Sequence, residues 1–330
     1  MKFAVLRRPR TRAILDGRLK LDTLPIDWHP ITDPLNWLPP SGEREHGILS
    51  GAFDGGEMSI ASFMQAKAQG APLLALPIFL KRGLVQRCLF SSVDSPLTSP
   101  SQLTGKRIGM VSYSSSMALW IRGLLSDIYG LSRSEPLWFS LISPSQKAQV
   151  TTKVLDFPKK FSGEQIQAWE ELDGYPHKLN RRERFLVLLL EKRELDAVIS
   201  FHPTIASPRI RPLLGSEDEF WSHYQKKGVY PINHLFVIRE ELFSTFPNVA
   251  SELVTFFKKA REFWLDYLPT ERRATMEREM ARLGWDPFAY RLGDTERRTL
   301  ETLIGYLVEE KLISKKLSVN ELFHKDSLLL

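Results

Sequence analysis

The side chains best suited to binding or acid–base chemistry lie in four turns, each of which joins a short apolar segment to a helical one. Such turns gather ligands in open α/β sheets, because helix starts present unpaired N–H groups there. The first turn has the sequence RRPRT and offers Arg8, Arg10 and Thr11 to an anion. A solvated basic patch explains the same residues equally well.

The second turn places one carboxylate, Glu57, between two glycines and an apolar helical segment, with Ser59 two residues later. Paired glycines indicate that the backbone approaches another group closely. An acid near a helix start also complements the helix dipole, which contributes roughly 0.3 to 1 kcal/mol. Either a ligand contact or a structural cap therefore explains Glu57.

The remaining two turns are rich in hydroxyl groups and nitrogen atoms. Three consecutive serines before a helical segment suit a carboxylate or phosphate, and plain helix capping also accounts for them. These serines are Ser114, Ser115 and Ser116. His234 interrupts an apolar strand, either as a hydrogen-bonded core histidine or as a ligand contact or general base. Arg82, which follows another apolar strand, could grip a carboxylate.

The composition indicates an ordinary folded protein of 330 residues with a formal net charge of +6, which favours anionic small-molecule ligands. No recognition motif accompanies the charge, so we expect no nucleic-acid partner. The longest apolar run, FLVLLL, is far too short for a membrane span. The first residues lack the apolar core of a secretory signal, so we expect a cytoplasmic protein.

Several reaction classes lack their signatures. The single cysteine, Cys88, allows neither an internal disulfide nor a cysteine-based zinc site. The histidines show no metal-ligand spacing, and neither a phosphate-binding loop nor a nucleophilic serine motif is present. We therefore expect no bound metal.

Short apolar strands alternate with amphipathic helices along the chain, which predicts an α/β fold. A Ser- and Pro-rich connection separates two α/β parts, and a later segment returns to the first part. We expect two lobes, residues 1–92 with 206–330 and residues 93–205. Each lobe would be a mixed sheet flanked by helices, and the C-terminal part would add a helical layer.

Five stretches point to a known family: FDGGEMSIASF, LPIFLKR, LTGKRIGMVSYSSSMALWIRGLLSDIYG, GVYPINHLFVIREEL and DPFAYRLGDTERRTLETLIGYLVEEKLISKKLSVNELF. Their order and spacing resemble those of 4,5-dihydroxyphthalate decarboxylase and its relatives, and only residues 144–178 stay unmatched. The resemblance implies the clamshell fold of type II periplasmic binding proteins. It also implies decarboxylation of a small aromatic carboxylate, as in phthalate degradation, without an organic cofactor.

Some positions keep the family's pattern and others depart from it. The matching residues are Arg10, Glu57, Arg82, Arg122 and His234. Pro9 stands where the family tends to have an acid, Gln86 where it has a histidine, and Ser112 where it has a glutamate before Tyr113. The departures lie at the turns expected to face a ligand, which indicates changed chemistry or lost catalysis.

The turns and the resemblance together predict a carboxylate-binding cleft between the lobes. The expected substrate contacts are Arg10, Thr11, Ser59, Arg82, Tyr113, Ser114, Ser115 and Ser116. Within this set the two arginines would hold carboxylates and the serines would cradle an anion. His234 and Glu57 would transfer protons.

Two alternatives to a carboxy-lyase remain open. A non-catalytic binding protein of the same fold, as a transporter-type solute receptor or a sensor, fits the lost ionisable groups. Another cytoplasmic enzyme on this fold, such as one of menaquinone or thiamin-precursor synthesis, is the third hypothesis, although the cysteine-rich motif of the thiamin-precursor enzymes is absent. A homo-oligomer is compatible with each hypothesis.

Overall fold

A computed structural model of the chain describes residues 1–31, 43–142, 152–155, 181–200, 209–213 and 217–325. The chain divides into two compact units. The first consists of Met1–Gly83, Tyr224–Gly305 and Ile313–Leu330, and the second of Leu84–His223 and Tyr306–Leu312. Each unit is built around a mixed β-sheet, as the alternation of strands and helices predicts.

The first unit holds a five-stranded sheet with the order β2-β1-β3-β11-β4. Its strands are β1 (Lys2–Leu6), β2 (Asp27–Ile31), β3 (Gly55–Ser59), β4 (Leu73–Arg82) and β11 (Ile232–Arg239). β1 runs parallel to β2 and β3, whereas β11 runs antiparallel to β3 and β4. Every residue of β3 is buried, as is typical of a strand in the middle of a covered sheet.

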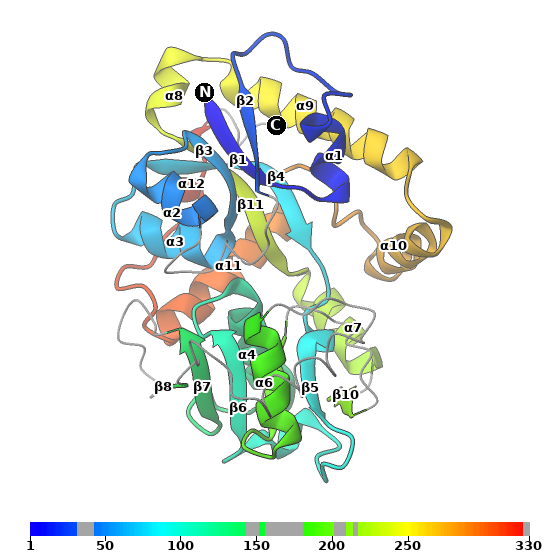
Figure 1. Cartoon of the computed structure of the whole chain (residues 1–330). Coiled ribbons are helices and arrows are strands. Elements are labelled where there is room, and N and C mark those ends of the chain that lie inside the picture. The colour runs from blue at the N-terminus through cyan, green and yellow to red at the C-terminus, as the bar shows by residue number, and fades with distance from the viewer. Residues whose placement is uncertain (32–42, 143–151, 156–180, 201–208, 214–216, 326–330) are drawn as a thin grey trace. The chain divides into compact units, whose positions relative to one another are not determined.

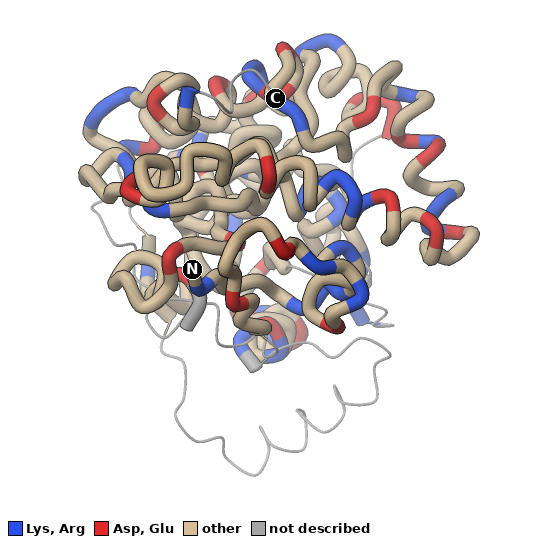
Figure 2. The backbone as a smooth tube through the Cα atoms, turned by 90° about the horizontal axis from the view of Figure 1, so that it is seen from above, with Lys and Arg blue, Asp and Glu red and all other residues tan. Residues whose placement is uncertain are grey.

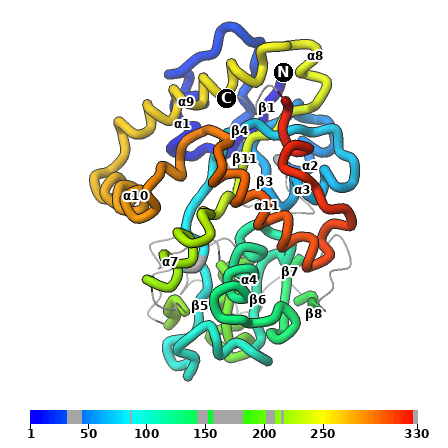
Figure 3. The backbone as a smooth tube through the Cα atoms, turned by 180° about the vertical axis from the view of Figure 1, so that it is seen from behind, coloured from blue at the N-terminus to red at the C-terminus, as the bar shows by residue number. Residues whose placement is uncertain are grey.

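Helices cover both faces of this sheet (Figure 1 and Figure 3). The helices of the first unit are α1 (Pro9–Leu15), α2 (Glu43–Ser50), α3 (Ile60–Ala68), α8 (Glu241–Thr245), α9 (Val249–Asp266), α10 (Thr270–Leu283), most of α11 (Asp294–Glu309) and α12 (Val319–Leu322). α1, α8 and α9 share one apolar cluster with the sheet, in which Phe3, Phe236 and Phe257 are fully buried. Each such side chain contributes roughly 1.5 to 3 kcal/mol by its burial. Of the expected helical C-terminal part, α8, α9 and α12 pack on strands of the first sheet.

The second unit holds a six-stranded sheet with the order β10-β5-β9-β6-β7-β8. Its strands are β5 (Leu89–Ser92), β6 (Arg107–Ser112), β7 (Leu137–Ile142), β8 (Thr152–Val154), β9 (Ala197–Ile199) and β10 (Ile210–Pro212). Its helices are α4 (Ser116–Tyr129), α6 (Arg181–Glu191), most of α7 (Glu217–Lys227) and the short 3-10 helices Gln86–Cys88 and Pro100–Leu103. α4 begins at a Ser115 cap and ends at Gly130, whose φ of 66° suits glycine.

The boundaries between the compact units differ from the expected lobe boundaries at 92/93 and 205/206. β5 pairs with β9 and β10 and so belongs to the second sheet, which moves the first crossing back to Gly83. β10 and the first part of α7 also stay with the second unit, so the chain returns only at Tyr224.

Some sequence features have a limited structural counterpart. Most of residues 144–178, which matched no pattern, lie outside the described residues. Figure 2 shows basic and acidic residues interspersed along the described backbone, in keeping with a small net charge. Among the described helices, none has the length and apolar character that crossing a bilayer requires.

Candidate functional site

Glu57 and His234 meet because they lie on neighbouring antiparallel strands. In the register of β3 and β11, Glu57 is opposite Phe236 and Ser59 is opposite His234. Glu57 and His234 are therefore diagonal neighbours on one face of the sheet, close enough for long side chains to touch. The Nδ1 atom of His234 lies 2.6 Å from the Oε1 atom of Glu57.

The two glycines before Glu57 allow the strands themselves to approach closely. Gly56 has a φ of 146°, and a Cβ atom there would lie 2.0 Å from the carbonyl oxygen of Ala4 in β1. A Cβ atom on Gly55 would lie 2.2 Å from the carbonyl oxygen of Val237 in β11. The close approach that the glycines predicted is thus made by neighbouring strands.

Glu57 is fully buried but has several polar partners. Besides His234, the Nε atom of Arg8 lies 3.6 Å from Oε1, and the backbone N–H of Leu6 donates to Oε2 over 3.4 Å. A buried carboxylate needs such compensation, because desolvation opposes its charge. Arg8 stands in the first turn beside the expected contacts, and its side chain keeps 31% of its surface exposed.

The contact with Glu57 also defines the chemistry of the histidine ring. When Nδ1 of His234 carries the proton and donates it to Glu57, Nε2 is the basic nitrogen of the neutral ring. A carboxylate behind the ring stabilises the imidazolium that forms when Nε2 takes a proton. The pair can therefore act as a general base and then as a general acid.

The helix-cap explanation of Glu57 does not match the geometry. Glu57 lies within β3, and the helix after it, α3, begins at Ile60. The backbone N–H of Ser59 donates to the Oε1 atom of Glu45 over 2.9 Å, so Glu45 serves the start of α3. Ser59 is buried and makes no capping hydrogen bond through its side chain. Its role as a substrate contact stays a prediction.

Arg10 lies against two aromatic rings near the same end of the sheet. Its guanidinium carbon is 4.6 Å from the ring centre of Trp264 and 5.2 Å from that of Phe288. It also donates to the carbonyl oxygen of Leu80 over 3.4 Å. These contacts orient the partly exposed guanidinium, while its expected grip on a substrate carboxylate stays a prediction.

Tyr290 lies beside Arg10 as well, although no sequence pattern singled it out as a site residue. The residue is 2% exposed, and burial raises the pKa of its hydroxyl. The charges of Arg10 and Arg261 and a hydrogen bond with Arg10 lower that pKa, and the charge of Glu57 raises it. Tyr290 thus lies within electrostatic range of both Arg10 and Glu57. Its place in the DPFAYRLGD stretch was the only signal.

Thr11 and Arg82, two of the expected substrate contacts, bond to other residues of the first unit. The hydroxyl of Thr11 donates to the carbonyl oxygen of Leu6 over 2.5 Å and accepts from the N–H of Arg8 over 3.0 Å, which fixes the turn between β1 and α1. The Nη1 atom of Arg82 lies 2.9 Å from Oε1 of Glu296, and both side chains are fully buried. Burial lowers the pKa of Arg82, and Glu296 raises it only in part. Substrate binding by either residue stays a prediction.

The remaining expected contacts belong to the second unit. Ser115 caps α4 by accepting from the N–H of Ala118 over 3.3 Å, as plain capping predicts. Ser116 is the first residue of that helix and is buried. The Oγ atom of Ser114 is buried and has no hydrogen-bond partner among the described residues. Tyr113 is fully buried, and Arg122 lies 3.6 Å from its ring centre. An anion cradle here, and its joint action with Glu57, stay predictions.

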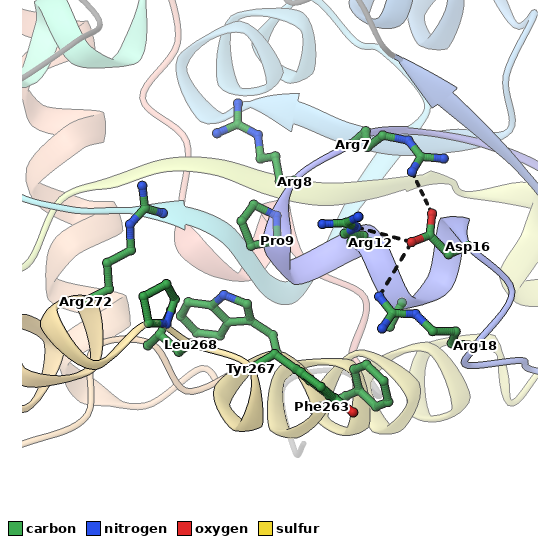
Figure 4. Close-up of a pocket in the computed structure, with 13 residues that line it drawn as sticks. Arg7, Arg8, Pro9, Arg12, Asp16, Arg18, Phe263, Tyr267, Leu268 and Arg272 are labelled. Atoms are coloured by element: carbon green, nitrogen blue, oxygen red, sulfur yellow. Dashed lines mark hydrogen bonds and ion pairs between the residues drawn. The ribbon is translucent and has the colours of Figure 1, made fainter. Parts of the chain in front are cut away.

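A pocket of about 630 Å³ in the first unit was not expected from the sequence. Its lining residues are Arg7, Arg8, Pro9, Arg12, Ala13, Asp16, Arg18, Phe263, Trp264, Tyr267, Leu268, Pro269 and Arg272. We call it the arginine pocket (Figure 4). Arg8 borders both this pocket and the Glu57–His234 pair. Across the described ranges, no group of His, Cys, Asp and Glu side chains suits a metal ion.

The fold is that of the periplasmic binding proteins. The chain is similar in structure to the periplasmic aliphatic sulphonate binding protein SsuA of Escherichia coli, with a TM-score of 0.58 and 12% sequence identity. The alignment covers 100% of this chain and 99% of the SsuA chain. The fold class indicated by the sequence is thereby confirmed.

Two curated proteins named 4,5-dihydroxyphthalate decarboxylase are similar in sequence. The one from Comamonas testosteroni is 24% identical over 348 residues, which cover 99% of this chain and 97% of that protein. The one from Pseudomonas putida is 26% identical over 201 residues, covering 60% of this chain and 69% of that protein. No family model matches the chain. The resemblance to these decarboxylases is confirmed.

Proposed function

We propose that the protein is a carboxy-lyase that binds a small aromatic carboxylate and releases CO₂ by acid–base chemistry at His234 and Glu57. The observation that carries the proposal is the buried contact of 2.6 Å between Nδ1 of His234 and Oε1 of Glu57. The names of the two similar decarboxylases support the reaction class.

The proposed reaction exchanges a carboxylate for a proton on a ring carbon. Nε2 of His234 takes the proton of a ring hydroxyl, and Glu57 stabilises the resulting imidazolium. The imidazolium then gives the proton to the carbon that carries the carboxylate, the bond from that carbon to the carboxylate breaks, and CO₂ leaves. The ring oxygen regains a proton from water, so the sum is one carboxylate and one proton converted to one ring hydrogen and CO₂.

The arginines of the first turn supply the charge that such a substrate needs. Arg8 is partly exposed while it touches Glu57, and Arg10 is oriented by two aromatic rings. Guanidinium groups bind carboxylates through paired hydrogen bonds, so these residues are suited to hold a second carboxylate of the substrate.

The test is CO₂ release from hydroxylated aromatic mono- and dicarboxylates carrying labelled carboxyl carbon. We expect release by the unchanged protein and a loss of roughly 10²- to 10⁴-fold in the His234→Gln variant. His223→Gln is the matched control, because His223 also lies beside an acid, 3.7 Å from Asp127, but in the second unit. Equal losses in both variants, or no release from any compound, would contradict the proposal.

A non-catalytic binding protein of this fold is the second candidate. The side chains of His234 and Glu57 are 4% and 0% exposed, which also fits a static buried pair. A ligand present at ~100 times its Kd stabilises the folded protein by roughly 2.7 kcal/mol, so thermal shifts reveal binding without turnover. Stabilisation by a carboxylate that releases no CO₂ would favour this second candidate.

A further inference from the structure

The arginine pocket has an excess of positive charge that its own acid does not neutralise. Arg7, Arg12 and Arg18 all pair with one carboxylate, that of Asp16, at 2.6, 3.3 and 3.5 Å. Arg272 lines the same pocket from α10 and forms no ion pair with the described residues. The five lining arginines therefore face a single lining acid, and within the described residues Arg8 alone among them also has Glu57 outside the lining, so an anionic ligand would compensate the remaining charge.

An aromatic wall lies beside these charges. Tyr267 is 71% exposed, and its ring centre is 5.0 Å from that of Phe263. The guanidinium of Arg18 stacks over both rings, at 5.0 Å from Phe263 and 6.0 Å from Tyr267. A large exposed aromatic side chain next to a guanidinium forms a surface on which a flat ring can stack.

The charges are distributed around the pocket. Figure 4 shows Arg272 on one side and Arg12 and Arg18 on the other, with Phe263 and Tyr267 along the α9 side. The volume of about 630 Å³ lies in the range of sites for drug-sized ligands and exceeds the needs of one small anion. A ligand that forms ion pairs with both groups of arginines needs more than one anionic group.

We propose that the arginine pocket is a second ligand site, which binds a flat ring bearing two or more carboxylate or phosphate groups. The ring stacks on Phe263 and Tyr267, while Arg12, Arg18 and Arg272 bind the anionic groups. Neither Glu57 nor His234 lines the pocket, so this ligand is separate from the one that the proton-transfer pair would bind. Arg8 contacts Glu57 and also lines the pocket, so a ligand in the pocket would lie next to a residue of the other site.

The proposal is tested by calorimetric titration with three probes: benzenetetracarboxylate, adenosine triphosphate and tripolyphosphate. We expect saturable binding of at least one ring compound and weaker binding of tripolyphosphate, which has no ring. Preference for the tetracarboxylate or for the nucleotide identifies carboxylate or phosphate as the anionic group. Absence of saturable binding of both ring compounds overturns the proposal.

Variants separate a built site from general charge attraction. The double change Arg12→Gln and Arg272→Gln should lower the affinity for the ring compounds by about tenfold or more. Tyr267→Ala should lower the affinity for the ring compounds and leave the affinity for tripolyphosphate unchanged. Arg278→Gln is the matched control, since Arg278 is an exposed arginine of α10 that does not line the pocket.

Two results of the variant series would overturn the proposal. Equal weakening by Arg278→Gln would mean that only net charge matters. If Glu57→Gln lost the binding of the ring compounds, the pocket and the proton-transfer pair would form one ligand site and not two. The titrations need no turnover, so a protein that releases no CO₂ can still bind these probes, and the two proposals fail separately.

Discussion

Each unit of the protein buries a glutamate beside a basic side chain, but the two clusters differ in how completely the charge is matched. In the second unit, Glu310 receives hydrogen bonds from both Arg122 and Arg133, and the Arg122 side chain is fully buried. In the first unit, Glu57 faces a histidine, and its arginine partner Arg8 is partly exposed.

This difference separates a structural cluster from a candidate reactive one. Arginine stays protonated at any ordinary pH, so Arg122 does not exchange a proton with Glu310, and the buried pair fits a structural role. A histidine can gain and lose a proton under mild conditions, and a partly exposed arginine can exchange one anion for another. Burial of an acid is therefore weak evidence of function until its partners are known.

The largest effect on stability is expected for Glu310→Gln. Removing this charge leaves two arginines beside a neutral group, and breaking a buried pair typically lowers the free energy of unfolding by about 3 to 5 kcal/mol. Denaturant unfolding measures the loss. Glu309→Gln is the control, because Glu309 is 57% exposed and pairs with Arg133 at the surface, where a loss below about 1 kcal/mol is expected. Similar losses in both variants would show that the buried Glu310 contributes no more to stability than the exposed Glu309.

Glu57→Gln should affect activity more than stability. The amide still accepts from Nδ1 of His234 but no longer stabilises an imidazolium, so the free energy of unfolding should fall by about 1 to 3 kcal/mol. Release of CO₂ should fall at least about tenfold. Unfolding and labelled-CO₂ assays on one preparation measure both. A loss of stability as large as that of Glu310→Gln, with unchanged activity, would place Glu57 among the structural acids.

Arg8→Gln should have a still smaller effect on folding. Because its side chain is partly exposed and 3.6 Å from Glu57, the contribution to stability should stay below about 1 kcal/mol. The affinity for an anionic substrate should nevertheless fall, which titration measures. Unchanged affinity together with a large loss of stability would show that Arg8 only compensates Glu57.

The strand and helix pattern could be predicted because periodicity and local signals determine it. The helix after Ser115 follows from apolar spacing and a capping residue near it in sequence. Glu57, which the sequence pattern placed in a turn at a helix start, instead lies within β3. The placement of β5 in the second sheet could not be predicted, since its pairing with β9 and β10 joins residues about a hundred positions apart.

The candidate site was predictable only in part, for the same reason. Glu57 and His234 were identified by type and position, but their contact spans 177 residues and depends on strand register. Arg82 looked like a ligand grip because its partner, Glu296, lies 214 residues away. The arginine pocket combines α1, α9 and α10, and no local pattern joins Arg12 to Arg272.

The smallest effect is expected for a partly exposed pair of the second unit, Arg107 and Asp196. Burial raises the pKa of Asp196, but hydrogen bonds from the side chain and backbone of Arg107 lower it below the ordinary 3.8. A lowered pKa stabilises the fold above pH 3.8, and this contribution disappears as the pH falls through the folded value. Asp196→Asn should therefore reduce stability at neutral pH by at most about 1 kcal/mol, because solvent screens the pair.

The pH dependence of unfolding checks this last expectation. The difference between Asp196→Asn and the unchanged protein should narrow below pH 3.8. A difference that stays constant across the acid range would mean that the charge of Asp196 has no part in it.

The backbone of Gly56 limits which residues around Glu57 and His234 can be substituted. Any side chain at Gly56 would collide with Ala4 and push β1 away from β3, and this displacement would carry Leu6 and Arg8 away from Glu57. The turn that follows β1 has no such constraint at Arg8, whose side chain reaches solvent. New substrate preferences are therefore more accessible through changes in that turn than through changes in β3, which makes the turn the natural target for redesign.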